Sequence, residues 1–278
     1  MRGDGDRRGA ASPPVSRRVL LAAGGAVLLT SAAAVIAEPG ARAHSASSDP
    51  GLAGPATSRS ARQHMDLIGR AARPPRPRQP RLPYGEPMYT VRDGPKVIAL
   101  TIDDGPSPVY TPQVLRILQQ YGVTASFSMV GRNAAAFPGV AREVAAAGHM
   151  IVNHTWNHHN LNHMPAVAVR DEISHATDAI HAATGKRPSM FRAPYGVWSR
   201  AVFSYCAQAR LTPLAWSVDP RDWSRPGIRA IVRDIVADTR TGAIILEHDG
   251  GGNRSQTVAA LKIWLPRLLE AGYQFTTP

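Results

Sequence analysis

The sequence predicts an α/β protein, a distorted barrel of the (β/α)7 type, with its functional site at the carboxyl ends of the strands. Two observations lead to this fold class. Over residues 87–278, short apolar runs alternate with longer segments of helical periodicity. Polar clusters follow five of the apolar runs, and in a parallel sheet the carboxyl ends of the strands meet on one face.

Seven apolar runs are the expected strands, and six segments between them are the expected helices. The expected strands are 97–102, 124–130, 149–152, 189–191, 212–218, 243–247 and 273–276. The expected helices are 111–121, 133–147, 165–184, 198–209, 227–239 and 255–271. Ser199 suits a helix start, and Gly122 and Gly185 stand where C-terminal caps belong. Seven strands, each separated from the next by a helix, predict a parallel sheet, either open or closed into a barrel. The counts favour a barrel that resembles the (β/α)8 type with one unit missing.

The first residues differ in composition from the rest of the chain. Arg17 and Arg18 precede an uncharged Ala/Gly/Leu/Val run over 19–37, and Ala-Arg-Ala follows at 41–43. This layout is typical of an export signal with a cleavage site, and the two arginines resemble the twin-arginine type. We therefore expect an export signal over 1–43. The alternative is an uncleaved membrane anchor, since the run is about the shortest that spans a bilayer.

Residues 44–86 are rich in Pro, Ser, Ala and Arg and predict an extended linker before a folded domain at 87–278. Residues 1–86 hold 13 arginines against six acidic residues, so more than half of the net charge of +12 lies outside the folded domain. These arginines lack interleaved aromatic residues, which argues against a nucleic-acid partner. We interpret the charge as favouring solubility and adhesion to an anionic cell wall. The single cysteine, Cys206, is expected to be buried and inert.

Five polar clusters follow expected strands. They are DDGP at 103–106, NHTWNH at 153–158, RAPYG at 192–196, DPRDW at 219–223 and EHDG at 247–250. In the first cluster Asp103 and Asp104 are adjacent, and neighbouring carboxylates repel each other. Either both are solvated in a turn, or a cation and a reaction hold them there. Convergence of the five clusters on one face would bring carboxylates, imidazoles and a guanidinium together.

A metal site is indicated by His154 and His158, which are four residues apart; on one helical turn this spacing turns both rings to the same side. With one aspartate they would form the ligand set of catalytic zinc sites. An isolated pair of this kind is more often a hydrogen-bonded surface pair, but residues 149–163 hold five histidines, which favours a metal. Non-haem iron oxygenases use the same ligands. The strand–helix alternation argues against them, since they are generally built on jelly-roll sheets.

Taken in order, these segments resemble the five motifs of the polysaccharide deacetylases, the NodB-homology group or carbohydrate esterase family 4. The matching stretches are TIDDGP at 101–106, HTWNH at 154–158, RAPYG at 192–196, DPRDW at 219–223 and LEHD at 246–249. The match covers about residues 95–276. Ile102 stands where the family often has Phe, and His159 where Pro is frequent. His159 could compete with its neighbour for a metal, and the spacing favours His158.

The resemblance implies a role for each cluster. A divalent metal, usually Zn²⁺ with Co²⁺, Mn²⁺ or Ni²⁺ as alternatives, would be held by Asp104, His154 and His158. Asp103 would be the general base that takes a proton from water, which gives the paired carboxylates separate tasks. Arg192 would pair with Asp103, and the backbone N–H of Tyr195 would stabilise the oxyanion formed from an acetamide carbonyl.

The same resemblance supplies a general acid. His248 would protonate the leaving nitrogen, for which its ordinary pKa of ~6.5 is suited. Asp222 would hydrogen-bond that imidazole, and Trp223 and Leu246 would wall the pocket for the acetyl methyl group. Strand alternation points Glu247 away from this pocket, so we interpret it as structural.

The sequence thus predicts an exported, metal-dependent polysaccharide N-deacetylase, a hydrolase that releases acetate from N-acetylglucosamine units. Peptidoglycan is the first choice of substrate, because export and a basic linker suit an anionic wall. Chitin-type oligomers and acetylxylan are alternatives. A non-catalytic carbohydrate-binding protein on the same fold is the competing class, although retention of base, ligands and acid argues against it. We expect a secreted or wall-associated monomer whose partner is an N-acetylated polysaccharide.

Overall fold

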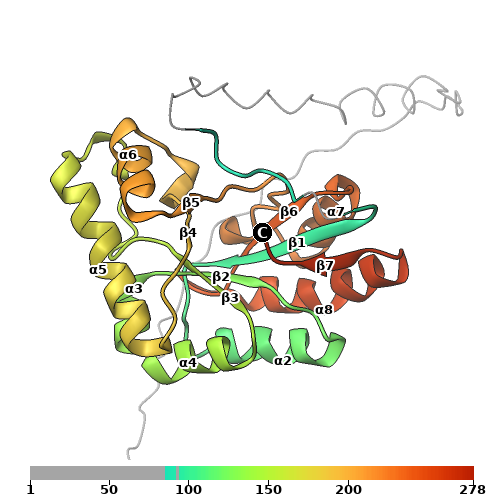
Figure 1. The fold of residues 1–278 in the computed structure, drawn as a ribbon. Coiled ribbons are helices and arrows are strands. Elements are labelled where there is room, and N and C mark those ends of the chain that lie inside the picture. The colour runs from blue at the N-terminus through green and yellow to red at the C-terminus, as the bar shows by residue number, and fades with distance from the viewer. Residues whose placement is uncertain (1–84, 92–93) are drawn as a thin grey trace, which may run out of the picture. The chain divides into compact units, whose positions relative to one another are not determined.

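The computed structural model describes residues 85–91 and 94–278 (Figure 1). The expected export signal at 1–43 and nearly all of the expected linker at 44–86 lie outside the described residues. Within the described residues, no helix combines the length and the apolar character needed to cross a membrane.

In the described part of the chain, seven parallel strands form one curled sheet (Figure 1). The strands are β1 Val97–Asp103, β2 Ser126–Met129, β3 Met150–Asn153, β4 Met190–Phe191, β5 Thr212–Pro213, β6 Ile244–His248 and β7 Gln274–Thr276. Their order is β5-β4-β3-β2-β1-β6, and β7 pairs with the start of β1. The predicted α/β barrel of the (β/α)7 type is therefore confirmed.

The sheet closes on itself through the segment that follows β5. The strand expected at 212–218 is only two residues long as β5, and Pro213 has no N–H with which to extend a ladder. The chain then crosses to the opposite edge of the sheet, where Val218 forms a parallel bridge with Ile245. The Leu246 N–H donates to the Val218 carbonyl at 2.9 Å. The expected strand is thus divided between two partners, which is what closes the barrel.

Helices cover the outer face of the sheet, with α2, α4 and α8 along one side and α5 and α6 along another (Figure 1). The helices are α2 Thr111–Tyr121, α3 Gly131–Ala136, α4 Pro138–Ala146, α5 Ala166–Thr184, α6 Arg200–Ala209, α7 Ile228–Asp238 and α8 Ser255–Glu270. Single 3₁₀ turns are η1 Leu161–His163, η2 Pro194–Gly196 and η3 Asp222–Ser224. The Ser199 side chain caps α6, and Gly122 and Gly185 end α2 and α5 in the left-handed conformation, as predicted.

One expected helix is wrong in its extent. The segment 133–147 forms two helices, α3 and α4, which meet at Phe137. Pro138 explains the break, because proline lacks the N–H of a helical hydrogen bond and disfavours the helical conformation in the residue before it. The chain therefore turns at Phe137 and starts a new helix with Pro138 in the first position.

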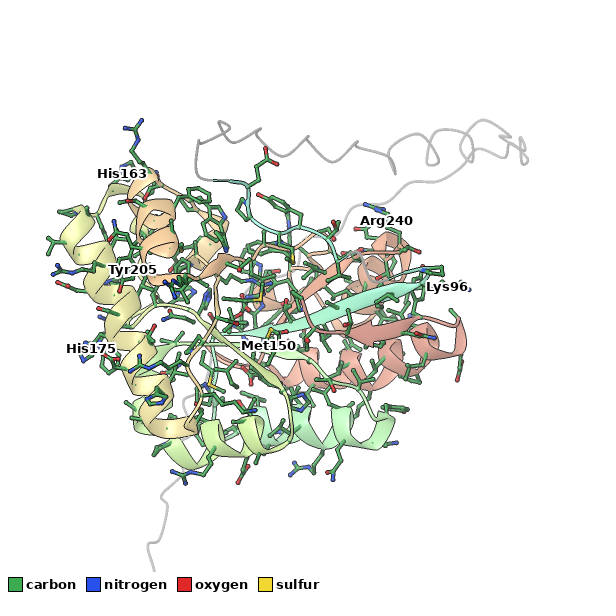
Figure 2. The ribbon with its side chains drawn as sticks, viewed as in Figure 1. Lys96, Met150, His163, His175, Tyr205 and Arg240 are labelled. Carbon is green, nitrogen blue, oxygen red and sulfur yellow. The ribbon has the colours of Figure 1, made fainter. Side chains whose placement is uncertain are left out.

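Two of the three apolar clusters in the described residues lie on opposite faces of β1. The outward-facing side chains of β1 are buried against the helices: Ile98, Leu100 and Ile102. Inside the barrel, Ala99 packs in a second cluster, which Met150 joins near the centre of Figure 2. Further along the inward face of β1 the residues are polar, namely Thr101 and Asp103. The interior is thus apolar toward the amino-terminal end and polar at the carboxyl end.

The direction of the strands shows on which side of the molecule the polar end of the barrel lies. Lys96 and Arg240 precede β1 and β6, and Figure 2 shows both on the same side of the molecule. His175 of α5 lies on the opposite side of that view. The strands therefore run from the side of Lys96 and Arg240 toward α5, and the loops that carry the five polar clusters follow at their far ends.

Candidate active site

Asp103 and His248 are neighbours across two adjacent strands. Asp103 is the last residue of β1 and pairs in register with His248, the last residue of β6. In-register residues of parallel strands point to the same face, and here that face is the barrel interior. Both side chains are buried, at 2% and 9% exposure. The sheet itself thus brings the predicted base and the predicted acid together.

Asp104 leaves the strand at once. Its φ of 73° lies in the left-handed region, which non-glycine residues rarely adopt. The Asn133 side-chain amide donates to the Asp104 carbonyl at 2.9 Å and helps to hold this turn. The turned backbone lets the carboxylate of Asp104 face the same region as Asp103, although strand alternation would have sent it to the other face.

The predicted metal ligands meet around Asp104. The Asp104 Oδ1 atom lies 3.5 Å from the Nε2 atom of His154 and 3.1 Å from the Nε2 atom of His158. One ligand atom from each of the three residues lies within 4.8 Å of those of the other two. His159 does not join them, because its exposed ring faces Glu172, with 3.3 Å between Nδ1 and Oε1. The structure thus places His158, and not His159, at the cluster.

The prediction that a helical turn brings His154 and His158 together is wrong. His154 and His158 are not on a helical turn but in the loop that follows β3. Left-handed φ values at Thr155 (67°) and His158 (62°) bend the loop, and the Thr155 hydroxyl accepts the His158 N–H at 2.9 Å. The two rings meet edge to face with centroids 4.9 Å apart. A strained loop therefore produces the geometry that a helix had been expected to supply.

The chemistry of these donor atoms fits a cation. The Arg192 carbonyl lies 2.7 Å from the Nδ1 atom of His154, and a carbonyl can only accept, so Nδ1 carries the proton. The Nε2 lone pair of His154 then points toward Asp104, whose Oδ1 atom is buried and accepts no hydrogen bond among the described residues. Lone pairs that face one another repel unless a positive charge lies between them. Asp104, His154 and His158 would supply that site.

The electrostatics of Asp104 agree with this assignment. Burial raises the pKa of its carboxyl group, but the imidazoles of His154 and His158 outweigh burial and hold the pKa well below its usual range. The carboxyl group of Asp104 is therefore ionised at neutral pH, as an anionic ligand requires.

Asp103 is held by a buried guanidinium. Arg192 is fully buried, and its Nη1 atom donates to Asp103 Oδ1 at 2.8 Å and to the Thr101 hydroxyl at 2.7 Å. Its Nη2 atom donates to the Ala215 carbonyl at 2.8 Å. The other oxygen of Asp103 lies 3.7 Å from the Nε2 atom of His154. The carboxylate is thus oriented on one side and left facing the imidazole cluster on the other.

His248 is paired with Asp222, as the resemblance implied. Its Nδ1–H donates to Asp222 Oδ1 at 2.7 Å, and its backbone N–H donates to Oδ2 at 2.9 Å. The Thr257 hydroxyl of α8 donates to the same Oδ2 at 2.7 Å. Burial lowers the pKa of His248, but Asp222 outweighs burial, with smaller contributions from Asp104 and Asp103, and the pKa rises to about 9. The imidazolium form is therefore favoured at neutral pH.

Three further predicted residues surround this centre. Tyr195 is 64% exposed, has a φ of 61°, and packs its ring edge to face against His158 at a centroid distance of 4.8 Å. Trp223 follows Asp222 and is 52% exposed. Leu246 is buried and stands two residues before His248 on the same inward face of β6. Tyr195 and Trp223 thus expose their rings to solvent, whereas Leu246 is buried.

Several residues of the site have no signal in the local sequence. They are Thr101 and Ala215 beside Arg192, Thr257 beside Asp222, Asn133 at the Asp104 carbonyl, Arg254 near Asp104, and Trp216 under the Tyr195 turn. A Cβ atom at Gly196 would lie 2.7 Å from the ring of Trp216, so only glycine lets this turn approach the indole. The Arg192 guanidinium lies over the Trp216 ring, with 5.6 Å between the Cζ atom of Arg192 and the centre of the ring.

Two acidic residues of the last cluster are structural. Glu247 points outward and accepts a hydrogen bond from the Trp264 indole of α8 at 3.0 Å, as strand alternation predicted. Asp249 accepts a hydrogen bond from the Thr111 hydroxyl, and its backbone N–H donates to the Asp103 carbonyl at 3.0 Å. Burial raises the pKa of Asp249 to about 7. Away from the site, Cys206 is buried as expected, and burial raises the pKa of its thiol to about 12.

The fold and the site together define a class, an α/β-barrel hydrolase in which buried Asp103 and His248 stand beside a cluster of carboxylate and imidazole groups suited to a cation. The sequence model of one family, described as "Polysaccharide deacetylase", matches residues 90–214. The chain is 39% identical over 206 residues to a chitooligosaccharide deacetylase of Bradyrhizobium sp., covering 68% of this chain and 94% of that protein. It is 41% identical over 197 residues to a peptidoglycan-N-acetylglucosamine deacetylase of Bacillus cereus, covering 70% and 92%.

A solved structure agrees with these relatives. The crystal structure of a peptidoglycan N-acetylglucosamine deacetylase has a TM-score of 0.66 and 30% identity, covering 68% of this chain and 89% of the other. The chain therefore belongs to the polysaccharide deacetylase family, carbohydrate esterase family 4. It is a hydrolase that acts on carbon–nitrogen bonds other than peptide bonds.

Proposed function

We propose that this protein is an exported, metal-dependent N-deacetylase that removes acetyl groups from N-acetylglucosamine units of peptidoglycan. The observation that carries the chemistry is the position of Asp103 and His248, which are in register on adjacent strands beside the cluster formed by Asp104, His154 and His158. A base and an acid on either side of one region are what amide hydrolysis requires, because water must lose a proton and the leaving nitrogen must gain one.

Asp103 is the base in this proposal. Arg192 holds its Oδ1 atom, so the Oδ2 atom stays turned toward His154. Because the guanidinium is itself held by Thr101 and the Ala215 carbonyl, the carboxylate cannot rotate freely away from an incoming water. When bound at the neighbouring cluster, a divalent cation supplies Lewis acidity, which makes water more acidic and polarises a carbonyl.

His248 is the acid. Asp222 raises its pKa to about 9, so the imidazole carries two protons at neutral pH, and the Nδ1–H is committed to Asp222. The Nε2 proton is then the one available to the nitrogen of the departing sugar. The asymmetry between the two ring nitrogens thus fixes which atom delivers the proton.

Tyr195 contributes its backbone. We assign its N–H to the developing negative charge on the acetyl oxygen, as the family pattern implies. Two observations support this assignment: the Tyr195 ring contacts His158, which brings the turn to the edge of the cluster, and its left-handed φ of 61° makes the turn tight. Trp223 and Leu246 would enclose the acetyl methyl group.

The choice of peptidoglycan rests on charge. Relatives of both kinds are similar to this chain, one named for peptidoglycan and another for chitooligosaccharides. Here Arg221 and Arg225 flank the exposed Trp223, and both are themselves exposed. Peptidoglycan carries carboxylates on its peptide stems, whereas chitin oligomers are neutral, so exposed cationic side chains next to Trp223 in the chain favour the former. The export signal and basic linker read from 1–86 point to the same location outside the cytoplasm.

The test is acetate release from three substrates with and without chelator. We expect release from peptidoglycan to exceed release from chitooligosaccharides and acetylxylan, to stop with chelator, and to return when Zn²⁺ or Co²⁺ is added. Arg221→Ser with Arg225→Ser should lower activity on peptidoglycan several-fold and leave chitooligosaccharides unaffected, whereas Arg142→Ser on α4 should change neither. No release from any substrate after metal reloading would support a carbohydrate-binding protein instead.

A further inference from the structure

Arg254 precedes helix α8 and reaches back to the carboxylate of Asp104. The residue is 5% exposed, which is unusual for arginine and requires partners. Its Nε atom donates to the Gly250 carbonyl at 2.6 Å, and its Nη1 atom donates to the Trp223 carbonyl at 3.1 Å. Its Nη2 atom lies 3.9 Å from Asp104 Oδ2. One guanidinium thus contacts three loops of the site.

The glycines between β6 and Arg254 make this approach possible. A Cβ atom at Gly250 would lie 2.1 Å from the Asp104 carbonyl oxygen. At Gly251, whose φ is +71°, it would lie 2.6 Å from Asp104 Oδ2 and 3.2 Å from the Nη2 atom of Arg254. Side chains at these positions would separate the guanidinium from the carboxylate. The two glycines therefore allow the Arg254 guanidinium to approach the carboxylate of Asp104.

The two oxygens of Asp104 consequently face different groups. Oδ1 faces the Nε2 atoms of His154 and His158, and Oδ2 faces Arg254. We propose that Arg254 is a positioning residue that holds Oδ2 of Asp104 away from the imidazoles, so that only Oδ1 is offered to a cation. This inference rests on the proposed function, because it concerns the same cluster.

Holding Oδ2 in this way limits the number of donor atoms that the chain offers to a cation. With Oδ1 alone, the cluster offers one oxygen and two nitrogens, which leaves positions open for water and for a substrate carbonyl. A carboxylate free to rotate could offer both oxygens and fill one of those positions. Holding the carboxylate is thus a way of keeping the site reactive.

Each of the paired carboxylates then has its own arginine. Arg192 donates to Asp103 at 2.8 Å, whereas Arg254 stands 3.9 Å from Asp104, beyond hydrogen-bond distance. The longer separation orients Oδ2 by charge without a strong bond. Lysine would not replace Arg254, because a single ammonium group cannot contact Gly250, Trp223 and Asp104 in fixed directions at once.

The positive charge of Arg254 predicts the direction in which its removal changes the affinity of the site for a cation. A guanidinium beside a cation site opposes cation binding, so its removal should leave cation affinity unchanged or raise it, while turnover falls. A side chain that merely supports the fold would behave differently, because its loss would weaken cation binding and turnover together. Affinity and turnover are therefore measured side by side.

The experiment compares Arg254→Met and Arg254→Lys with Arg267→Met, a control at an exposed arginine near the other end of α8. Co²⁺ is the probe, and the full chain is used. For Arg254→Met we expect kcat to fall 10- to 100-fold, Co²⁺ affinity by calorimetry to stay equal or rise up to tenfold, and the visible absorption of bound Co²⁺ to weaken as its coordination number rises. Arg254→Lys should lie between this variant and the unaltered protein, and Arg267→Met should match the unaltered protein.

Two results would overturn the inference. One is an Arg254→Met or Arg254→Lys variant that melts normally and keeps the Co²⁺ spectrum and kcat of the unaltered enzyme. The other is a fall of Co²⁺ affinity in proportion to kcat in both variants, which would indicate a structural role. Failure of the unaltered enzyme to bind Co²⁺ would instead reject the proposed function, and this inference with it.

Discussion

Two Asp–His groups stand at the carboxyl end of the barrel, and they differ in how their polar atoms are satisfied. In the pair of Asp222 and His248, both carboxylate oxygens accept hydrogen bonds, two from His248 and one from Thr257. In the cluster of Asp104, His154 and His158, Oδ1 of Asp104 is buried and accepts no hydrogen bond among the described residues.

The difference shows how one set of residue types can serve two tasks. The hydrogen bonds of the Asp222–His248 pair favour one protonation state, because Asp222 outweighs burial and raises the pKa of His248 to about 9. A cluster whose buried lone pairs face one another is incomplete by itself, and a cation completes it. Asp103 stands beside both groups and takes its orientation from Arg192.

The largest effect should come from Asp103, which belongs to neither group. For Asp103→Asn we expect kcat to fall about 10³-fold, in the range found for loss of a general base, with cation affinity within a few-fold of the unaltered protein. Acetate release and calorimetry with Co²⁺ measure the two quantities. Asp171→Asn, at an exposed position of α5, is the matched control. Full activity of Asp103→Asn would remove this residue as the base.

The second largest effect is expected on cation binding, in which the two groups should differ. His154→Asn and His158→Asn should each weaken Co²⁺ binding by about 100-fold or more, because each removes one of three donors, whereas Asp222→Asn should change it by less than threefold. His159→Asn, next to the cluster in sequence but turned toward Glu172, should bind Co²⁺ normally. The distinction between the groups fails if Asp222→Asn weakens binding as strongly as His154→Asn.

A smaller loss of turnover is expected for Asp222→Asn, about 100-fold, together with a change in the pH profile. Asp222 raises the pKa of His248 to about 9, so the imidazolium is present below that pH and is lost above it. Without the anion the pKa falls, and the alkaline limb of kcat should move down by one pH unit or more. The profile of kcat between pH 6 and 10 measures this shift. An unmoved alkaline limb would show that His248 is not the group that titrates.

The smallest effect concerns stability, at Asp249. The pKa of this carboxyl group is about 7 in the folded protein, above its usual 3.8, so folding favours the protonated form. Its contribution to stability therefore decreases as the pH rises from about 4 through 7. Asp249→Asn removes the penalty while keeping an acceptor for Thr111. We expect a gain of roughly 1–3 kcal/mol in the free energy of unfolding at pH 8 and almost none at pH 4.

Urea unfolding of the chelated protein at the two pH values measures this gain. Chelation matters because a bound cation would screen Asp103 and Asp104, which contribute to the raised pKa of Asp249. Equal stability of Asp249→Asn and the unaltered protein at pH 8 would contradict the assignment of a costly buried carboxyl group.

Much of the site could be read from the sequence because its motifs are continuous. Local spacing is enough to recognise two of these pairs, Asp103 with Asp104 and His154 with His158, because the members of each pair lie within a few residues of each other. The helical turn expected for the histidines was wrong, since spacing alone does not distinguish a helix from a strained loop. The single helix expected at 133–147 was wrong. The apolar periodicity continues across Pro138, but the helical backbone is interrupted there.

By itself, the sequence determined which residue types follow which strands, and through the strand–helix alternation it determined that these residues converge. Only the tertiary structure decided the partners that come from distant segments: Thr257 for Asp222, the Ala215 carbonyl for Arg192, and Arg254 for Asp104. The physical reason is that a strand and the turn after it are specified by neighbouring residues. A hydrogen bond between segments far apart in the chain depends on how the barrel closes, and no local pattern encodes that closure.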